Sequence, residues 1–90
     1  MYIVAMIGND PQDMAELVSK LAQAIDQITS AMSTLDGKAQ SVRWEGPDAA
    51  RFKGTTWPTS KKQLHNVIND LNQVKTLVNK QKQQQIEASR

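Results

Sequence analysis

The feature that most constrains this chain is a heptad repeat of apolar residues in its first half. Nine apolar residues follow one another at alternating spacings of four and three: Met14, Val18, Leu21, Ile25, Ile28, Met32, Leu35, Ala39 and Val42. This period fits an α-helix with one apolar face, whereas a β-strand would need a period of two. Because the pattern stays in register beyond Asp36-Gly37, we expect one continuous helix over about residues 11–43.

Local signals mark both ends of this helix. Asp10 is a suitable N-cap and Pro11 suits the first helical position. At the other end, Gly46 can take a left-handed conformation that ends a helix, and Pro47 can begin the next one. A connection as short as residues 44–47 predicts that the two helices lie antiparallel, as a helical hairpin.

A second apolar seam predicts the second helix. Its members are spaced by three and four, and they are Leu64, Val67, Leu71, Val74 and Val78. We expect this helix over about residues 47–84, with a kink near residue 58 favoured over a short break, because Pro58 removes a helix hydrogen bond and clashes with the preceding turn. Residues 85–90 carry few apolar side chains and are expected to fray. Residues 1–90 thus form a single hairpin domain.

A single hairpin of two helices cannot enclose a core, and each apolar stripe is wide enough to contact more than one neighbour. We therefore expect an all-α fold in which two antiparallel hairpins dimerise into a four-helix bundle. The predicted hairpin and dimer core comprises Val18, Leu21, Ile25, Ile28, Met32, Leu35, Leu64, Val67, Leu71, Val74 and Val78.

The residues needed for catalysis are nearly absent. The chain has no cysteine, and its single histidine, His65, has no carboxylate three or four residues away. No glycine-rich phosphate loop is present. We expect no catalytic residue, metal, cofactor or small-molecule substrate, and hence no enzyme. The net charge of +2 does not require nucleic acid, and none is expected as a partner. The apolar run Tyr2–Ile7 is too short to span a bilayer. It has neither a basic leader nor a cleavage site, so we expect no ordinary secretory signal.

Two tryptophans, Trp44 and Trp57, flank the turn of the predicted hairpin. In one interpretation, Trp44 plugs the end of the bundle and Trp57 packs beside it. In the other, they form a partly exposed aromatic surface that another protein contacts, since tryptophan is enriched in binding hot spots. The two interpretations are compatible.

The motif at the turn resembles that of the WXG family of early-secreted-antigen-like proteins, which are small substrates of type VII secretion systems. The resemblance rests on Trp44-Glu45-Gly46, followed by Pro47-Asp48-Ala49, Phe52 and Trp57, and it is closest to the actinobacterial branch. It implies antiparallel hairpins that dimerise, with themselves or with a paralogous chain, and are exported as folded dimers without a cleaved signal peptide. It also implies a secretion-system ATPase as a partner, and Trp44, Gly46, Phe52 and Trp57 as the turn and recognition residues.

One departure concerns the export signal. Family members or their partners often carry a tyrosine followed four residues later by an acid after the second helix, whereas the only tyrosine here is Tyr2. A partner would then supply that motif. The sequence thus favours a non-enzymatic type VII secretion substrate or export partner, synthesised in the cytoplasm and then secreted or displayed at the cell surface. The alternatives are a cytoplasmic structural or regulatory coiled-coil module and, less favoured, a basic helical module that binds nucleic acid or membrane.

Overall fold

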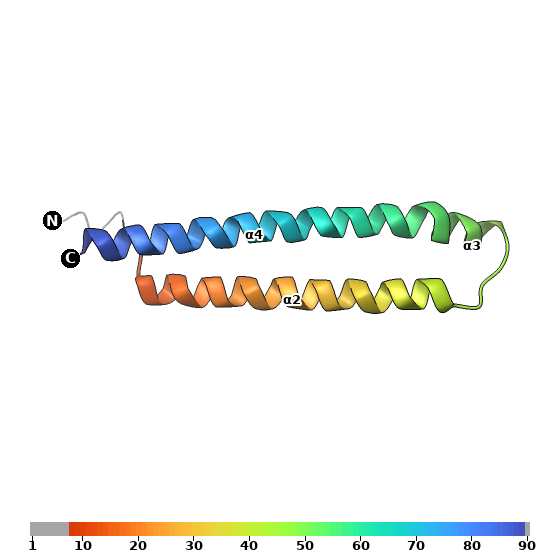
Figure 1. Ribbon diagram of the computed structural model, residues 1–90, viewed down its shortest axis with the longest axis horizontal. Coiled ribbons are helices and arrows are strands. Elements are labelled where there is room, and N and C mark those ends of the chain that lie inside the picture. Colours follow the sequence, from red (N-terminus) through yellow and green to blue (C-terminus); the bar gives the residue numbers. More distant parts are fainter. Residues whose placement is uncertain (1–7, 90) are drawn as a thin grey trace.

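Two long antiparallel helices make up most of the protein. The computed structural model describes residues 8–89. In it, α2 (Pro11–Ser41) and α4 (Trp57–Ala88) lie side by side as a hairpin of 68 × 16 × 14 Å (Figure 1). The short helix α3 (Pro47–Arg51) and a π-helical turn (Phe52–Thr56) lead from the connection into α4. The predicted all-α helical hairpin is confirmed.

Helix α2 begins where the sequence predicts and ends slightly earlier. The Asp10 carboxylate accepts hydrogen bonds from the backbone N–H groups of Gln12 (2.9 Å) and Asp13 (3.4 Å), and so satisfies donors that have no partner within the helix. The helix runs through Gly37 without a break. It ends at Ser41 rather than at residue 43, because Val42 adopts an extended conformation in which its carbonyl accepts from the Lys53 ammonium at 3.4 Å.

Gly46 has a positive φ, but it does not end α2 as the sequence analysis expected. Four residues separate it from Ser41, and it instead precedes Pro47 as the N-cap of α3, with φ 109° and ψ 177°. This region of conformational space is accessible essentially to glycine alone. The glycine therefore shapes the start of the second helical segment.

Helix α4 differs from expectation at both ends. The irregularity expected near residue 58 lies just before that residue, as the π-helical turn Phe52–Thr56. In this turn the backbone N–H of Trp57 donates to the carbonyl of Phe52. The wider turn accommodates Pro58, which has no N–H to donate and would crowd the carbonyl one turn back. At the other end the helix continues to Ala88, past the expected end at residue 84, and Ser89 caps it by donating to the Gln85 carbonyl.

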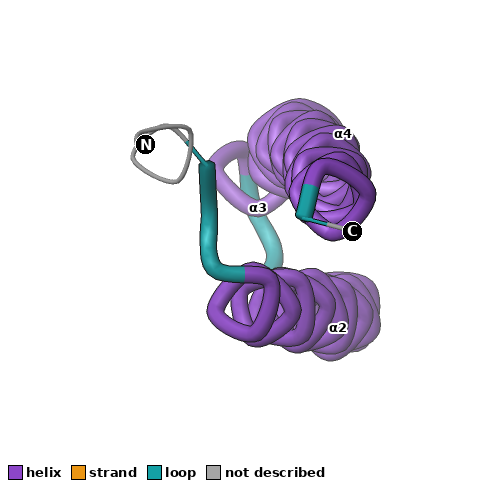
Figure 2. Tube along the Cα trace, turned by 90° about the vertical axis from the view of Figure 1, so that its left-hand side faces the viewer, coloured by secondary structure: helices purple, strands orange, loops and turns teal. Residues whose placement is uncertain are grey.

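The interior of the hairpin is thin. Only Met32, Ala39 and Ala49 are buried among the described residues. Most of the predicted core is half-buried, namely Val18, Leu21, Ile25, Ile28, Leu64, Leu71 and Val78. Three predicted core residues, Leu35, Val67 and Val74, are exposed in the single hairpin. The view along the helices shows the reason, because α2 and α4 contact each other along one side only and no other described element covers their flanks (Figure 2).

Candidate functional site

The aromatic residues singled out in the sequence come together at the turn. The Trp44 and Phe52 rings are tilted by 46° with their centroids 5.5 Å apart, a favourable arrangement for an aromatic pair. Together with Trp57 they line a groove of about 240 Å³, whose other lining residues are Leu35, Lys38, Ala39 and Val42. We call it the aromatic groove. Trp44 remains 43% exposed beside it.

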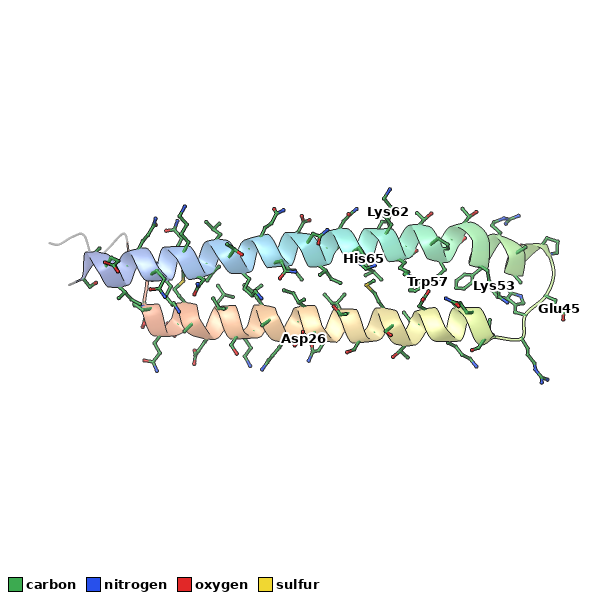
Figure 3. All side chains as sticks on the ribbon, in the orientation of Figure 1. Asp26, Glu45, Lys53, Trp57, Lys62 and His65 are labelled. Atoms are coloured by element: carbon green, nitrogen blue, oxygen red, sulfur yellow. The ribbon has the colours of Figure 1, made fainter. Side chains whose placement is uncertain are left out.

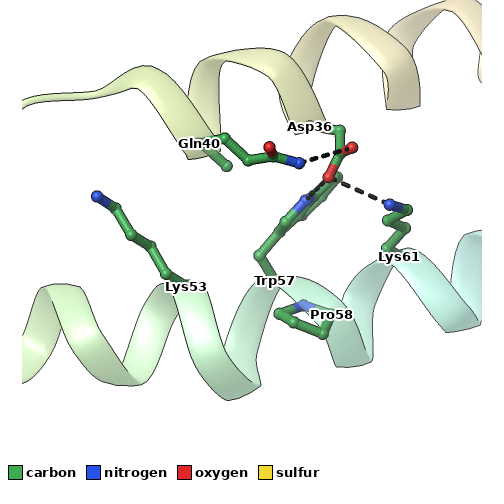
Figure 4. A pocket seen from close by; sticks show the side chains of 7 residues that line it. Asp36, Gln40, Lys53, Trp57, Pro58 and Lys61 are labelled. Carbon is green, nitrogen blue, oxygen red and sulfur yellow. Dashed lines mark hydrogen bonds and ion pairs between the residues drawn. The ribbon is translucent and has the colours of Figure 1, made fainter.

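A polar cluster fixes Trp57 from the opposite side. The Trp57 indole N–H donates to an Asp36 carboxylate oxygen at 2.8 Å, and the Lys61 ammonium lies 3.2 Å from the same oxygen. The Gln40 amide donates to the second oxygen at 3.2 Å (Figure 4). The hydrogen bond from Trp57, and then that from Lys61, lowers the pKa of Asp36 below its ordinary value of 3.8, because both donors favour the charged carboxylate.

This cluster belongs to a second groove. It has a volume of about 330 Å³ and is lined by Asp36, Ala39, Gln40, Lys53, Trp57, Pro58 and Lys61. Trp57 and Ala39 line both grooves, so they form the partition between them. The indole of Trp57 therefore connects an apolar groove on one flank of the hairpin to a hydrogen-bonded polar cluster on the other.

The same division continues along the helices. Leu17 and Leu35 are 18 residues apart, which is about five helical turns, so their side chains point to the same flank. On α4, Val67 and Val74 lie about 120–140° around the helix from Lys61, toward the flank that Leu35 occupies. We call this side, with Leu17, Leu35, Val67 and Val74, the apolar flank. The aromatic groove is its end at the turn.

Net charge differs between the turn end and the remainder of the hairpin, along its long axis rather than between its two flanks. Residues 36–62, which include the turn, carry six basic and three acidic side chains, a net charge of +3. The described residues outside this stretch, 8–35 and 63–89, carry four basic and six acidic side chains, a net charge of −2 with His65 neutral. Two of the three acids near the turn are already paired, Asp36 with Lys61 and Asp48 with Arg51. The turn end therefore presents basic side chains beside the aromatic groove.

Within residues 8–89, no group of three or more His, Asp or Glu side chains could hold a metal ion. His65, labelled in Figure 3, is exposed on α4, one helical turn beyond Lys61. None of the described helices is both apolar enough and long enough to span a bilayer. What the turn end offers is a set of aromatic and basic side chains around two grooves.

Sequence reasoning identified Trp44, Gly46, Phe52 and Trp57, and the structure gathers the three aromatics around one groove. It did not identify Asp36, Gln40 and Lys61 as the partners that hold Trp57. Asp36 and Trp57 are 21 residues apart and on different helices, so no local spacing pattern links them. The one available signal was an acidic residue close to the inner face of the first helix.

In comparisons with known proteins, no family model, curated protein or solved structure matches this chain.

Proposed function

We propose that this protein is a non-enzymatic helical-hairpin substrate or export partner of a type VII secretion system, and that it acts through dimerisation and protein recognition. The observation that carries the proposal is the geometry of the Trp-Glu-Gly turn. Trp44 is partly exposed at the tip, packs on Phe52, and is followed by Gly46 in a conformation suited only to glycine. A turn motif placed between helices of 31 and 32 residues is the arrangement that the WXG family resemblance implies.

The apolar flank supports dimerisation as part of this function. Leu35 is 52% exposed, and Val67 and Val74 are exposed on the same flank. Several large apolar side chains exposed on one flank of a two-helix layer support a contact surface for another molecule. A second hairpin on this flank, either another copy or a paralogous chain, would complete a four-helix bundle.

Secretion tests the proposal directly. In a host with an intact type VII system, we expect the chain in the culture supernatant or at the cell surface, and we expect it to stay inside when the membrane ATPase of that system is deleted. A cell-lysis marker measured in the same samples controls for leakage. Export that does not depend on the ATPase, or complete retention with an authentic partner present, would contradict the proposal and favour a cytoplasmic coiled-coil module.

The partner can be identified in the same cells. Affinity purification of the tagged chain, followed by light scattering and mass spectrometry of the intact complex, separates a homodimer from a heterodimer. We expect a complex of two hairpins. A monomer at micromolar concentration would contradict the dimer part of the proposal while leaving the secretion part to the export assay.

A further inference from the structure

We propose that residues 2–7 bind to the open end of their own hairpin, over the exposed apolar side chains of Leu17, Val74 and Leu77, and that a second hairpin has to displace them there. The open end is the end opposite the turn, and we call these three residues the open-end patch. Residues 2–7 precede the part of the chain that the structure describes. The displacement rests on the proposed function, because it supposes that hairpins dimerise on the apolar flank.

The patch brings together large side chains from both long helices. Leu77 is 54% exposed, Leu17 is 44% exposed and Val74 is 43% exposed. Leu17 lies eight residues after Asn9, and Leu77 lies eight residues before Gln85, so the contact between Asn9 and Gln85 places the two leucines at the same level of the antiparallel hairpin. Val74 precedes Leu77 by three residues and is its neighbour on α4. An exposed apolar cluster of this kind is a site for an apolar binding partner.

The chain enters the hairpin beside this patch. The loop before α2 crosses from α2 to α4 along one side of the hairpin (Figure 2). There the side-chain amide of Asn9 donates to the Gln81 carbonyl at 3.1 Å. Gln81 follows Leu77 by four residues and Val74 by seven, so all three lie on the same face of α4. The described chain therefore begins on the side of α4 that carries the patch.

Residues 2–7 are long enough to reach the patch. An extended chain spans about 3.3 Å per residue, so six residues cover about 20 Å. Gly8 lies against the Gln85 side chain. From there, Leu77 is about 12 Å away along α4 and Val74 is about 16 Å away. The segment therefore covers both side chains when it folds back over α4.

The composition of the segment matches the patch. Tyr2–Ile7 is the longest fully apolar run of the chain and carries no charged side chain. Removing such side chains from water against other apolar side chains is favourable. Because the segment is tethered through Gly8, its effective concentration at the patch is of the order of millimolar. A second hairpin at micromolar concentration therefore meets a patch that is already covered.

An acceptor without a donor lies where the segment joins the hairpin. The side-chain oxygen of Asn9 is buried and accepts no hydrogen bond from the described residues, whereas the amide nitrogen of the same side chain donates to Gln81. Leaving a buried acceptor unpaired is costly. A backbone N–H group of the segment, folded back over α4 from Gly8, is a suitable donor for this oxygen.

Paramagnetic relaxation enhancement tests the docking. Because the chain has no cysteine, Ala5→Cys provides a single site for a nitroxide spin label. The spin-labelled, isotope-labelled full chain is diluted with unlabelled chain, so that only effects within one chain are observed. We expect the strongest broadening of backbone amide signals at Val74 and Leu77. Broadening that is strongest at residues 81–89 would place the segment beyond the patch and overturn the proposal.

The reverse mixture identifies the origin of the segment. Here the spin label is on the chain without the isotope, so only effects between chains are observed. We expect no broadening at Val74 and Leu77 in this sample. Broadening there as strong as within one chain would assign the patch to the segment of another copy, which also overturns the proposal.

Self-association measures the competition with a second hairpin. The double variant Val4→Asp with Ile7→Asp puts charges into the segment, so that it no longer covers the patch. We expect it to self-associate several-fold more tightly than the wild type in sedimentation equilibrium. Gln83→Asp is the control, because it adds a charge on the face of α4 opposite Val74, and it should leave association unchanged. Association of the double variant that is unchanged or weaker, in protein that circular dichroism shows to be helical, would overturn the displacement.

The two proposals fail separately. The spin-label measurement requires neither a dimer nor export, so it decides the docking even if ATPase-dependent export is not found or if neither the wild type nor the double variant associates. Absence of broadening at the patch beside normal export and dimerisation would overturn only the docking of residues 2–7.

Discussion

The two flanks of the hairpin differ in how completely the chain satisfies them by itself. On one flank, Asp36 receives a hydrogen bond from Trp57 and an ion pair from Lys61, which join α2 to α4, and a further hydrogen bond from Gln40 within α2. On the other, Leu35, Val67 and Val74 remain exposed. Hydrogen bonds can be completed within two helices, but a two-helix layer cannot remove both sides of a wide apolar stripe from water. The chain thus satisfies its polar groups by itself on one flank and leaves large apolar side chains exposed to solvent on the other.

The largest expected effect separates the seam between the helices from the apolar flank. Met32, which is 6% exposed, lies between α2 and α4. Met32→Asp places an unpaired charge there and should remove at least about 3 kcal/mol of stability, so most helicity is lost. Val67→Asp changes a residue that is exposed in the single hairpin, and should retain more helicity while abolishing self-association. Circular dichroism melts at several protein concentrations measure both, because association makes the melting temperature concentration-dependent.

Lys62→Asp is the control for this pair, since Lys62 points away from α2 (Figure 3). It should change neither helicity nor association appreciably. If Val67→Asp instead unfolds the chain as fully as Met32→Asp, the two flanks are not energetically separable and the hairpin folds only as part of its dimer.

The next effect sharpens the role of the turn. Gly46→Val forces a side chain into a conformation with φ near 109° and should cost about 1–3 kcal/mol. Crowding does not contribute, because a Cβ added at Gly46 meets no atom within 4 Å. Gly37→Ala is the matched control, with equally open space but helical backbone, and should stabilise by about 0.5–1 kcal/mol. Urea denaturation of both variants checks the opposite signs, and an unchanged free energy of unfolding for Gly46→Val would show that the positive φ of Gly46 is not required.

Trp44→Ala should have a smaller effect on stability and a large one on export. Because Trp44 is only partly buried, its truncation should cost about 1–2 kcal/mol, less than the 3–5 kcal/mol of a fully buried tryptophan. The variant should keep its dimer and its helicity while secretion fails. Thermal melts beside the export assay decide between the two roles of this residue. Normal export of the variant would leave Trp44 with a structural role only.

The smallest effect concerns acid and the polar cluster. Because the native pKa of Asp36 is lowered below 3.8, the charged carboxylate stabilises the fold. That contribution is fully present at neutral pH and is lost as the pH falls below about 4 through the native pKa. Wild-type protein should therefore lose melting temperature more steeply between about pH 4 and pH 2 than Asp36→Asn, whose side chain cannot titrate. Parallel pH profiles of the two proteins would count against the cluster as a contributor to stability.

Much of the secondary structure could be predicted because it depends on short spacings. The apolar repeat in α2 continues past Asp36-Gly37 and outweighs that turn-forming pair, since a single exposed glycine costs a helix only about 1 kcal/mol. Asp10 as a cap and Gly46 as the position with positive φ follow from backbone chemistry local to each residue. The exact ends did not follow. Just after the end of α2, the Val42 carbonyl accepts a hydrogen bond from Lys53, a residue beyond the turn, and no local spacing pattern contains that contact.

The sequence by itself determined that this chain forms two long amphipathic helices around a tryptophan- and glycine-containing turn, because helix period, capping and positive φ are set by residues within a few positions of one another. Only the tertiary structure decided which side chains meet across the two helices. The pairing of Asp36 with Trp57 and the exposure of Val67 and Val74 depend on the rotation and register of α2 against α4. Rotation and register are both fixed by packing along the whole seam, so no local pattern contains them. The division into a closed polar flank and an open apolar flank depends on the same rotation and register.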